Sequence, residues 1–125
     1  MPVFGPQFGD VQLQYTRHKY FPEMEHQIHA VKDSGGTIAR MDWNEDGVIG
    51  NVDVDSAHRR KGIATKMWQF AQNLSQQDPT IAQIRHSTTR TPLGDQWAWA
   101  IHKKGLSEKP PKLGSPEWYT GEDTE

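Results

Sequence analysis

A change of hydrophobic period between residues 48 and 74 constrains the fold of this chain more than any other feature of the sequence. Val48, Val52 and Val54 alternate with polar or small residues, which is the period of a β-strand. Farther on, apolar residues recur at the spacing of an α-helix, and its expected buried face consists of Ile63, Met67, Phe70, Ala71 and Leu74. The sequence therefore predicts a strand that passes through a basic, glycine-containing turn into the N-terminus of a helix.

The turn between this strand and this helix has the chemistry of an anion-binding site. The first amide groups of a helix have no intrahelical acceptor and carry partial positive charge, so they bind phosphate. Gly62 allows the backbone to approach an anion closely, and Ala64 adds little side-chain bulk. Full positive charges beside the amides come from Arg59, Arg60 and Lys61. The alternative interpretation is a solvated basic turn that binds no ligand.

These residues resemble the acyl-CoA-binding motif of the GNAT N-acetyltransferase superfamily. In that motif a strand that ends in valine leads through a short turn into Arg/Gln-x-x-Gly-x-Gly/Ala, and Arg59, Gly62 and Ala64 stand at the three motif positions. Ser56 departs from the pattern, because the family often has proline there. The resemblance implies that acetyl-CoA is the co-substrate, with its pyrophosphate at the backbone of residues 60–65 and its pantetheine arm along the strand. The implied acetyl-CoA-binding residues are Val52, Val54, Arg59, Arg60, Lys61, Gly62, Ile63, Ala64 and Thr65.

Length, charge and cysteine content limit the domain number, the partners and the kinds of site that this chain can have. A chain of 125 residues is expected to form one domain with a single core. The formal net charge of −2 argues against a general nucleic-acid-binding protein. The chain has no cysteine, which excludes disulfides, thiolate metal sites and a cysteine nucleophile. No signal peptide or membrane-spanning stretch is recognisable, so a cytoplasmic protein with no membrane and no nucleic-acid partner is expected.

The rest of the chain predicts an α/β (α+β) fold. Residues 11–15, 26–32 and 37–43 read as strands of an antiparallel meander. Residues 81–86 predict a strand parallel to the one that ends at Val54, because a helix connects the two. The expected architecture is a GNAT-like mixed, mostly antiparallel sheet of about five strands, with a central parallel strand pair and two main helices.

The second helix is predicted to start at Thr91-Pro92 and to end near Gly105. Its expected buried face consists of Leu93, Trp97, Ala100 and Ile101. Residues 1–106 are expected to form a single GNAT-like domain, whose first nine residues are rich in glycine and proline and should be irregular. Residues 107–125 are expected to form an irregular, acidic C-terminal tail with Trp118 and Tyr119 as candidate anchors.

Acetylation of an amine requires a neutral amine, a polarised carbonyl and a proton donor for the leaving thiolate. In the family, the helix that follows the second parallel strand often carries a tyrosine that serves as the acid. Matching Gly105-Leu106 to the family's helix-ending Gly-Phe places Ile101 at the position of that tyrosine, so the usual acid is missing. The candidate catalytic residues are therefore His86, Ser87, His102 and Asp53, and each also has a purely structural interpretation.

Two departures from the family bear on function. Residues 17–25 are too few for the two helices that the family usually inserts there, and the tail shows no strand pattern. Those parts normally wall the acceptor site, so the site is expected to be open or to be completed by a protein partner or a homo-oligomer. The first hypothesis is an acetyl-CoA-dependent N-acetyltransferase that acts on an unidentified amine of a small molecule or a protein. The second is a non-catalytic GNAT-like protein with a vestigial acyl-CoA site, a protein-interaction or structural component of bacterial or viral origin.

Residues 42–53 also match a calcium-loop pattern, D-x-[DN]-x-[DN]-G followed by a late carboxylate. The matching residues are Asp42, Asn44, Asp46, Gly47 and Asp53. An EF-hand needs a helix before the loop, whereas residues 37–41 are strand-like, so a hairpin turn is the favoured interpretation. His26 and His29 would point to opposite faces of a strand, and no metal site is expected.

Overall fold

The computed structural model describes residues 3–18, 24–59 and 61–113. Contacts along the chain divide it into two compact units, residues 1–85 and residues 86–125, and each unit is described by itself. Among the described residues, no helix combines the length and the apolar character needed to cross a membrane.

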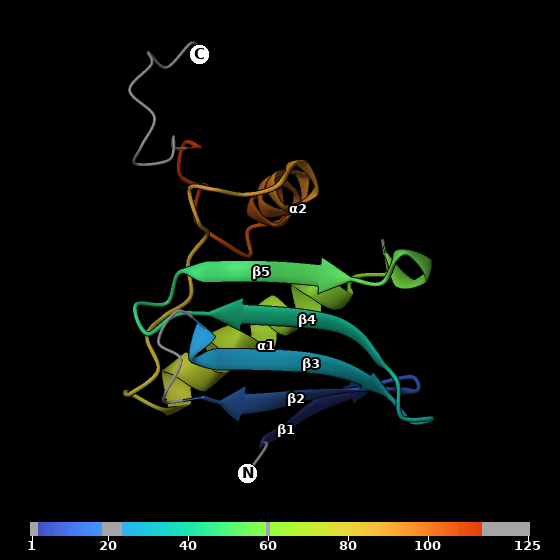
Figure 1. Ribbon diagram of the computed structural model, residues 1–125. Helices are drawn as coiled ribbons and strands as arrows, with labels where there is room; N and C mark the ends of the chain where they lie inside the picture. The colour runs from blue at the N-terminus through green and yellow to red at the C-terminus, as the bar shows by residue number, and fades with distance from the viewer. Residues whose placement is uncertain (1–2, 19–23, 60, 114–125) are drawn as a thin grey trace. The chain divides into compact units, whose positions relative to one another are not determined.

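The first unit contains a five-stranded antiparallel sheet in which the strands lie side by side in chain order (Figure 1). The strands are β1 (Val3–Phe8), β2 (Val11–Arg17), β3 (His26–Lys32), β4 (Thr37–Trp43) and β5 (Ile49–Val54). β2 pairs with β3 and β3 pairs with β4, both antiparallel, so the meander predicted for residues 11–43 is confirmed. With the helices described below, the α+β class is confirmed as well.

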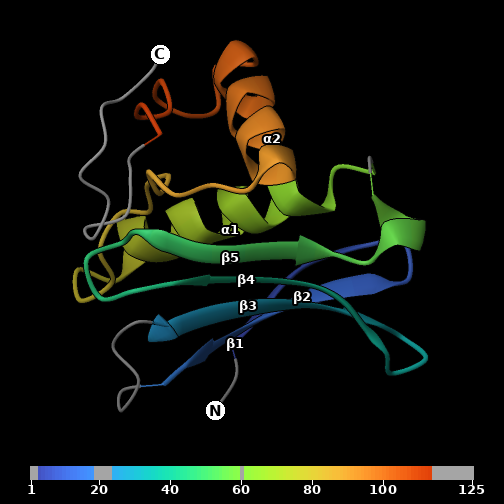
Figure 2. The same ribbon diagram turned by 45° about the horizontal axis from the view of Figure 1, so that its top comes forward.

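One face of the sheet packs against helix α1 (Ile63–Gln77), which crosses it in both ribbon views (Figures 1 and 2). The strands contribute Leu13, Ile28, Met41 and Trp43, all fully buried. All five predicted core residues of the helix are buried, and Trp68 joins them. Burial of each large apolar side chain contributes about 1.5–3 kcal/mol to folding, so this face is the main stabilising element of the unit.

The opposite face of the sheet is polar because the strands alternate. Its side chains come from Gln12, Gln14, Gln27, His29, Arg40, Asn51 and Asp53. His26 has an exposed fraction of 0% whereas His29 is half-buried, which confirms that they lie on opposite faces. α1 is the only α-helix in the described part of this unit, so the polar face has no helix of the same unit over it.

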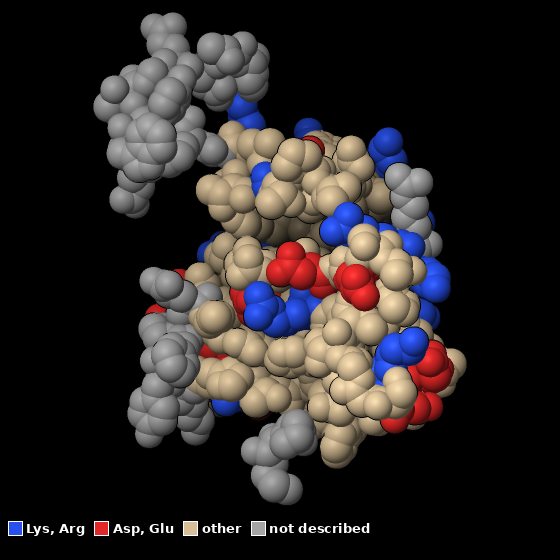
Figure 3. All heavy atoms as spheres, turned by 45° about the vertical axis from the view of Figure 1, so that its right-hand side comes forward, with Lys and Arg blue, Asp and Glu red and all other residues tan. Residues whose placement is uncertain are grey.

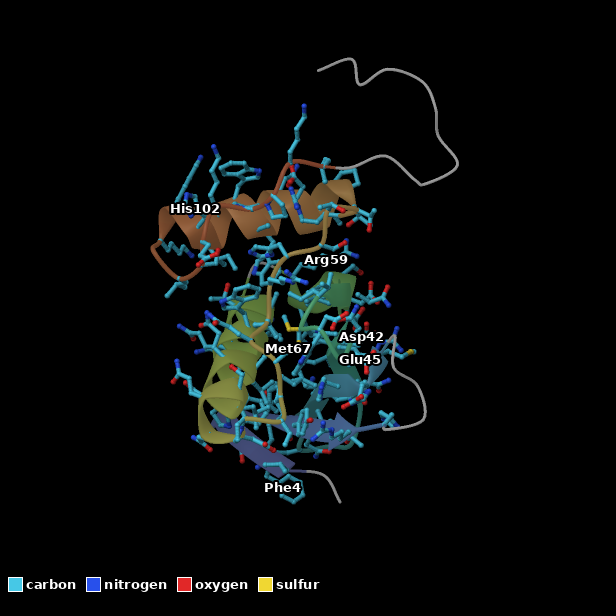
Figure 4. The ribbon with its side chains drawn as sticks, turned by 90° about the vertical axis from the view of Figure 1, so that its left-hand side faces the viewer. Phe4, Asp42, Glu45, Arg59, Met67 and His102 are labelled. Atoms are coloured by element: carbon cyan, nitrogen blue, oxygen red, sulfur yellow. The ribbon has the colours of Figure 1, made fainter. Side chains whose placement is uncertain are left out.

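The prediction that the N-terminal segment is irregular was wrong, because β1 pairs antiparallel with β2. The register shifts between Phe4 and Gln7, where Gly5 and Pro6 form an irregularity of the bulge type. A Cβ atom at Gly5 would lie 2.5 Å from the ring of Phe70, so glycine allows the strand to pass over this ring of α1. Phe4 is 62% exposed and projects from the surface (Figure 4).

The strand predicted at residues 81–86 does not form, and neither does the central parallel strand pair. The segment makes one isolated parallel bridge, between Val48 and Arg85. Ile49 N donates to Arg85 O over 3.1 Å, and Arg85 N donates to Gly47 O over 2.9 Å. Ile81 and Ile84, three residues apart, are the buried members of residues 81–85, which is not the alternation of a strand. The parallel direction was predicted correctly, but β5 remains an edge strand of the sheet.

The second unit is organised around helix α2 (Pro92–Lys103). The side chain of Thr91 caps this helix by accepting from Gly94 N over 3.1 Å, and Pro92 occupies the first helical position, so the predicted start is confirmed. The helix ends just before Gly105, whose φ of 76° lies in the left-handed region.

The predicted buried face of α2 was only partly right. Ile101 is buried, whereas Leu93 and Ala100 are exposed and Trp97 is half-buried. Ala98 is the second buried residue of the helix. Alanine and tryptophan alternate over residues 97–100, so the sequence pattern marked no single apolar face.

The segment after α2 has no helix or strand as far as residue 113, and Trp118 and Tyr119 lie outside the described residues. Arg90 ties this segment to the start of α2. Its Nη2 atom donates to Asp95 Oδ1 over 2.8 Å and to Pro111 O over 2.9 Å.

Candidate functional site

The connection from β5 to α1 leaves the start of the helix open. A single 3-10 turn (η2, Ser56–His58) follows β5, and Gly62 then adopts φ 81° as the N-cap of α1. Gly62 supplies no side-chain cap, and the first turn contains no acidic residue. Apart from its two chain neighbours, no described residue has an atom within 4 Å of where a Cβ of Gly62 would be. An uncapped helix start in open space can accept an anion, because its amides and dipole are positive.

Basic residues flank this helix start in the chain. Arg59 Nε donates to Val54 O over 3.0 Å, which holds the guanidinium at the end of β5. Lys61 is exposed, and Lys66 Nζ lies 5.0 Å from the ring centroid of Phe8. Figure 3 shows Lys and Arg side chains on the side of the molecule that carries this turn. Arg60, also predicted to bind the anion, lies outside the described residues.

The other predicted anion-site residues form the first turn of α1. Ile63 is buried and anchors the helix to the core, whereas Ala64 and Thr65 are half-buried. Lys66, which the motif did not mark, is a further basic residue four positions after the N-cap glycine. Lys66 N closes the first helical hydrogen bond with Gly62 O, over 3.0 Å.

The backbone of β5 alternates between its partner strand and the free edge of the sheet. Asp55 N donates to Ile38 O of β4 over 2.8 Å. Alternation then directs the N–H and C=O groups of Asp53 toward β4 and those of Val52 and Val54 toward the free edge. The backbone groups of the two valines predicted to pair with a pantetheine arm therefore face the free edge, where Val54 O already accepts from Arg59 Nε.

Asp53 lies on the polar face of the sheet. Its carboxylate is exposed, and Asp53 Oδ2 lies 3.7 Å from Arg40 Nη2. An exposed ion pair of this kind contributes about 0–1 kcal/mol, so Asp53 remains available for other contacts.

In the second unit, His86 is buried between a hydroxyl group and an aromatic ring. Ser107 Oγ donates its proton to Glu108 O over 3.0 Å and lies 3.3 Å from His86 Nε2, so Nε2 carries the hydrogen of this pair. The ring of Trp97 meets the imidazole edge-on at 5.5 Å between centroids. Burial, with smaller contributions from Arg90 and His102, lowers the pKa of His86 to about 4.

His102 is half-buried and converges on the same serine. Its Nδ1 atom lies 3.0 Å from Ser107 O, and a carbonyl oxygen only accepts, so Nδ1 carries the hydrogen and Nε2 carries a lone pair. Ser87, the other candidate, uses its hydroxyl oxygen to accept from Thr89 N over 3.0 Å within a local turn. The structure thus brings His86 and His102 together around Ser107, a residue that no local sequence signal marked.

The calcium-loop pattern forms a hairpin turn between β4 and β5. Asn44 Oδ1 accepts from Asp46 N and Val48 N, each over 2.9 Å, so the turn itself uses this oxygen. Asp42 is inside β4 and buried. In the part of the chain that the structure describes, no three His, Asp or Glu side chains are grouped to hold a metal ion.

The model of the Acetyltransferase (GNAT) family matches residues 4–106, which include α1, α2 and all of the sheet except Val3. No curated protein matches the chain. Since the family match covers most of the sequence, the chain belongs to the GNAT acetyltransferase family.

Proposed function

We propose that the protein is an N-acetyltransferase that uses acetyl-CoA to acetylate an amine. Family membership supports acetyltransferase chemistry in general. The observation that carries the finer proposal is the uncapped, acid-free start of α1 at Gly62, beside Arg59 and Lys61. The CoA pyrophosphate would accept hydrogen bonds from the first amides of the helix, and the basic side chains would neutralise its charge. The pantetheine amides would pair with the backbone of Val52 and Val54 at the edge of β5.

In the reaction, the amine nitrogen forms a bond to the carbonyl carbon of the thioester and the carbon–sulfur bond breaks. The amine loses a proton, and the leaving thiolate gains one. Among the histidines, His102 has the better chemistry for a base, because Ser107 O holds its Nδ1–H and leaves Nε2 with the lone pair. His86, with a pKa of about 4, is neutral at pH 7 but a weak base. Ser87 and Asp53 remain the other candidates.

Calorimetric titration with acetyl-CoA tests the proposal, using the matched variants Gly62→Glu and Gly62→Gln. Both side chains impose the same strain at φ 81°, but only glutamate adds a negative charge beside the pyrophosphate. Unit charges about 4 Å apart interact by about 1–4 kcal/mol near a surface, so Gly62→Glu should bind at least about fivefold more weakly than Gly62→Gln. No binding to the wild-type chain at millimolar acetyl-CoA would refute the proposal.

One observation favours a second candidate, a non-catalytic family member that keeps a vestigial acyl-CoA site. The residue matched to the family's catalytic tyrosine is Ile101, which is buried and cannot transfer a proton. A protein partner or a second copy of the chain would then complete the acceptor side. Acetylation of a panel of small-molecule and peptide amines distinguishes the two functions: binding of acetyl-CoA without product supports the second.

A further inference from the structure

A bulge in β5 determines which backbone groups reach the free edge. Asp42 pairs with Asn51 and the next residue, Trp43, pairs with Ile49, so Gly50 is an extra residue without a partner in β4. Before the bulge, Ile49 N points outward to Arg85 O. Regular alternation from Ile49 would turn residues 51 and 53 outward as well. The extra residue shifts this phase, so that Val52 and Val54 face outward instead.

The carboxylate of Asp42 holds this bulge in place. Its side chain is 1% exposed, although it lies on the polar side of the sheet, away from the core residue Met67 (Figure 4). Asn51 N donates to Asp42 Oδ1 over 3.1 Å, and Asn51 Nδ2 donates to Asp42 Oδ2 over 3.2 Å. The side chain of Asp42 thus accepts from Asn51 N, which would donate to a backbone carbonyl of β4 in a regular strand pair. A Cβ atom at Gly50 would lie 2.7 Å from Asp42 Oδ1, so any larger residue there would have to displace the carboxylate.

The surroundings of this carboxylate on the polar face have opposing effects on its charge. Burial raises the pKa of Asp42, the hydrogen bonds from Asn51 and the nearby Arg40 lower it, and Asp53 raises it. Arg40 Nε lies 4.0 Å from Asp42 Oδ2. His29 of β3 lies beside Arg40 on this face, and its own pKa is lowered by burial and by Arg40. A protonated Asp42 would keep one acceptor oxygen and lose the charge that strengthens both hydrogen bonds.

We propose that Asp42 is a positioning residue for acyl-CoA: by holding the bulge at Gly50 it directs the backbone of Val52 and Val54 to the edge where the pantetheine arm binds. This inference rests on the proposed function, since it concerns the same edge of β5. Loss of the carboxylate allows β5 to return to regular alternation, and a slip of one residue turns these backbone groups toward the wrong side. The residue that began the apparent calcium pattern therefore acts through the backbone of the next strand.

The test is the acetyl-CoA dissociation constant of the full-length wild-type chain and of Asp42→Asn, measured by calorimetry over a range of pH. Asparagine keeps the shape but loses the charge, and the NH2 group that replaces Oδ2 cannot accept from Asn51 Nδ2. Asp42→Asn should bind about tenfold more weakly, the equivalent of one charge-assisted hydrogen bond. Asp46→Asn, the same change at an exposed residue of the hairpin turn, should bind like the wild type.

A pH profile separates positioning from a merely structural role. Wild-type affinity should fall, relative to that of Asp42→Asn, as the pH drops through the raised pKa of Asp42. If Asp42→Asn fails to fold, Asn51→Ala replaces it, because Asn51 is exposed and its loss removes the Nδ2 hydrogen bonds. Equal affinities with parallel pH profiles would overturn the inference and leave the proposed function standing. A wild-type chain that does not bind acetyl-CoA would overturn both.

Discussion

Acid should destabilise this protein through His86. Burial lowers the pKa of this imidazole from 6.5 to about 4, so the folded chain takes up its proton at a lower pH than the unfolded chain. The contribution of His86 to the free energy of unfolding is therefore fully present above pH 6.5 and is lost as the pH drops toward about 4. At about 1.4 kcal/mol for each pH unit, the full loss from this histidine is about 3 kcal/mol as an upper value. His26 and His29, whose pKa values burial also lowers, contribute in the same direction.

Urea unfolding, followed by circular dichroism from about pH 7 to about pH 4, measures this loss in the wild type and in His86→Gln. Glutamine can still donate to Ser107 Oγ but cannot titrate. With a slope of about 1.5 kcal/mol per molar urea, a loss of about 3 kcal/mol lowers the urea midpoint of the wild type by about 2 M. The midpoint of His86→Gln should not show this decrease. His18→Gln serves as the control that keeps His86. Parallel losses in the wild type and in His86→Gln would refute the assignment of the acid sensitivity to His86.

Two further predictions concern the first unit. Gly47→Ala should lower the free energy of unfolding by about 2 kcal/mol or more, because φ is 89° there and a Cβ atom would collide with Gln83 O. Thermal unfolding measures this loss, and Gly36→Ala, where a Cβ atom would lie in open space, is the control. Met67→Ala should cost about 2–5 kcal/mol in urea unfolding because the side chain is fully buried under the sheet, and a loss no larger than that of Lys66→Ala would contradict the packing described.

Features encoded by neighbouring residues could be predicted from the sequence. The meander and the helix that begins at Ile63 follow from apolar periodicity, and the cap at Thr91 follows from a hydroxyl group before proline. Acyl-CoA binding at the turn around Gly62 was predicted from motif residues, and the geometry of the turn is compatible with it. That prediction itself awaits the titration.

Features that depend on distant partners were not predictable. β1 forms although it contains Gly5 and Pro6, because both lie in its irregular section and the missing Cβ of Gly5 makes room for Phe70. Residues 81–86 look like a strand, yet their pairing stops after one bridge at Arg85. The burial of Asp42 depends on an extra residue in the neighbouring strand, and alternation alone does not reveal such an insertion.

The irregular section of β1 also affects how the sheet meets other chains. β1 is one edge of the sheet, and an exposed edge strand is a template on which a strand of another molecule can add. Pro6 has no amide hydrogen, and the shifted register breaks the even spacing of donors and acceptors that such addition requires. The same Gly-Pro pair that made this segment look unstructured thus disfavours edge-to-edge aggregation there, and it allows Val3 and Phe4 to remain exposed beside an open strand.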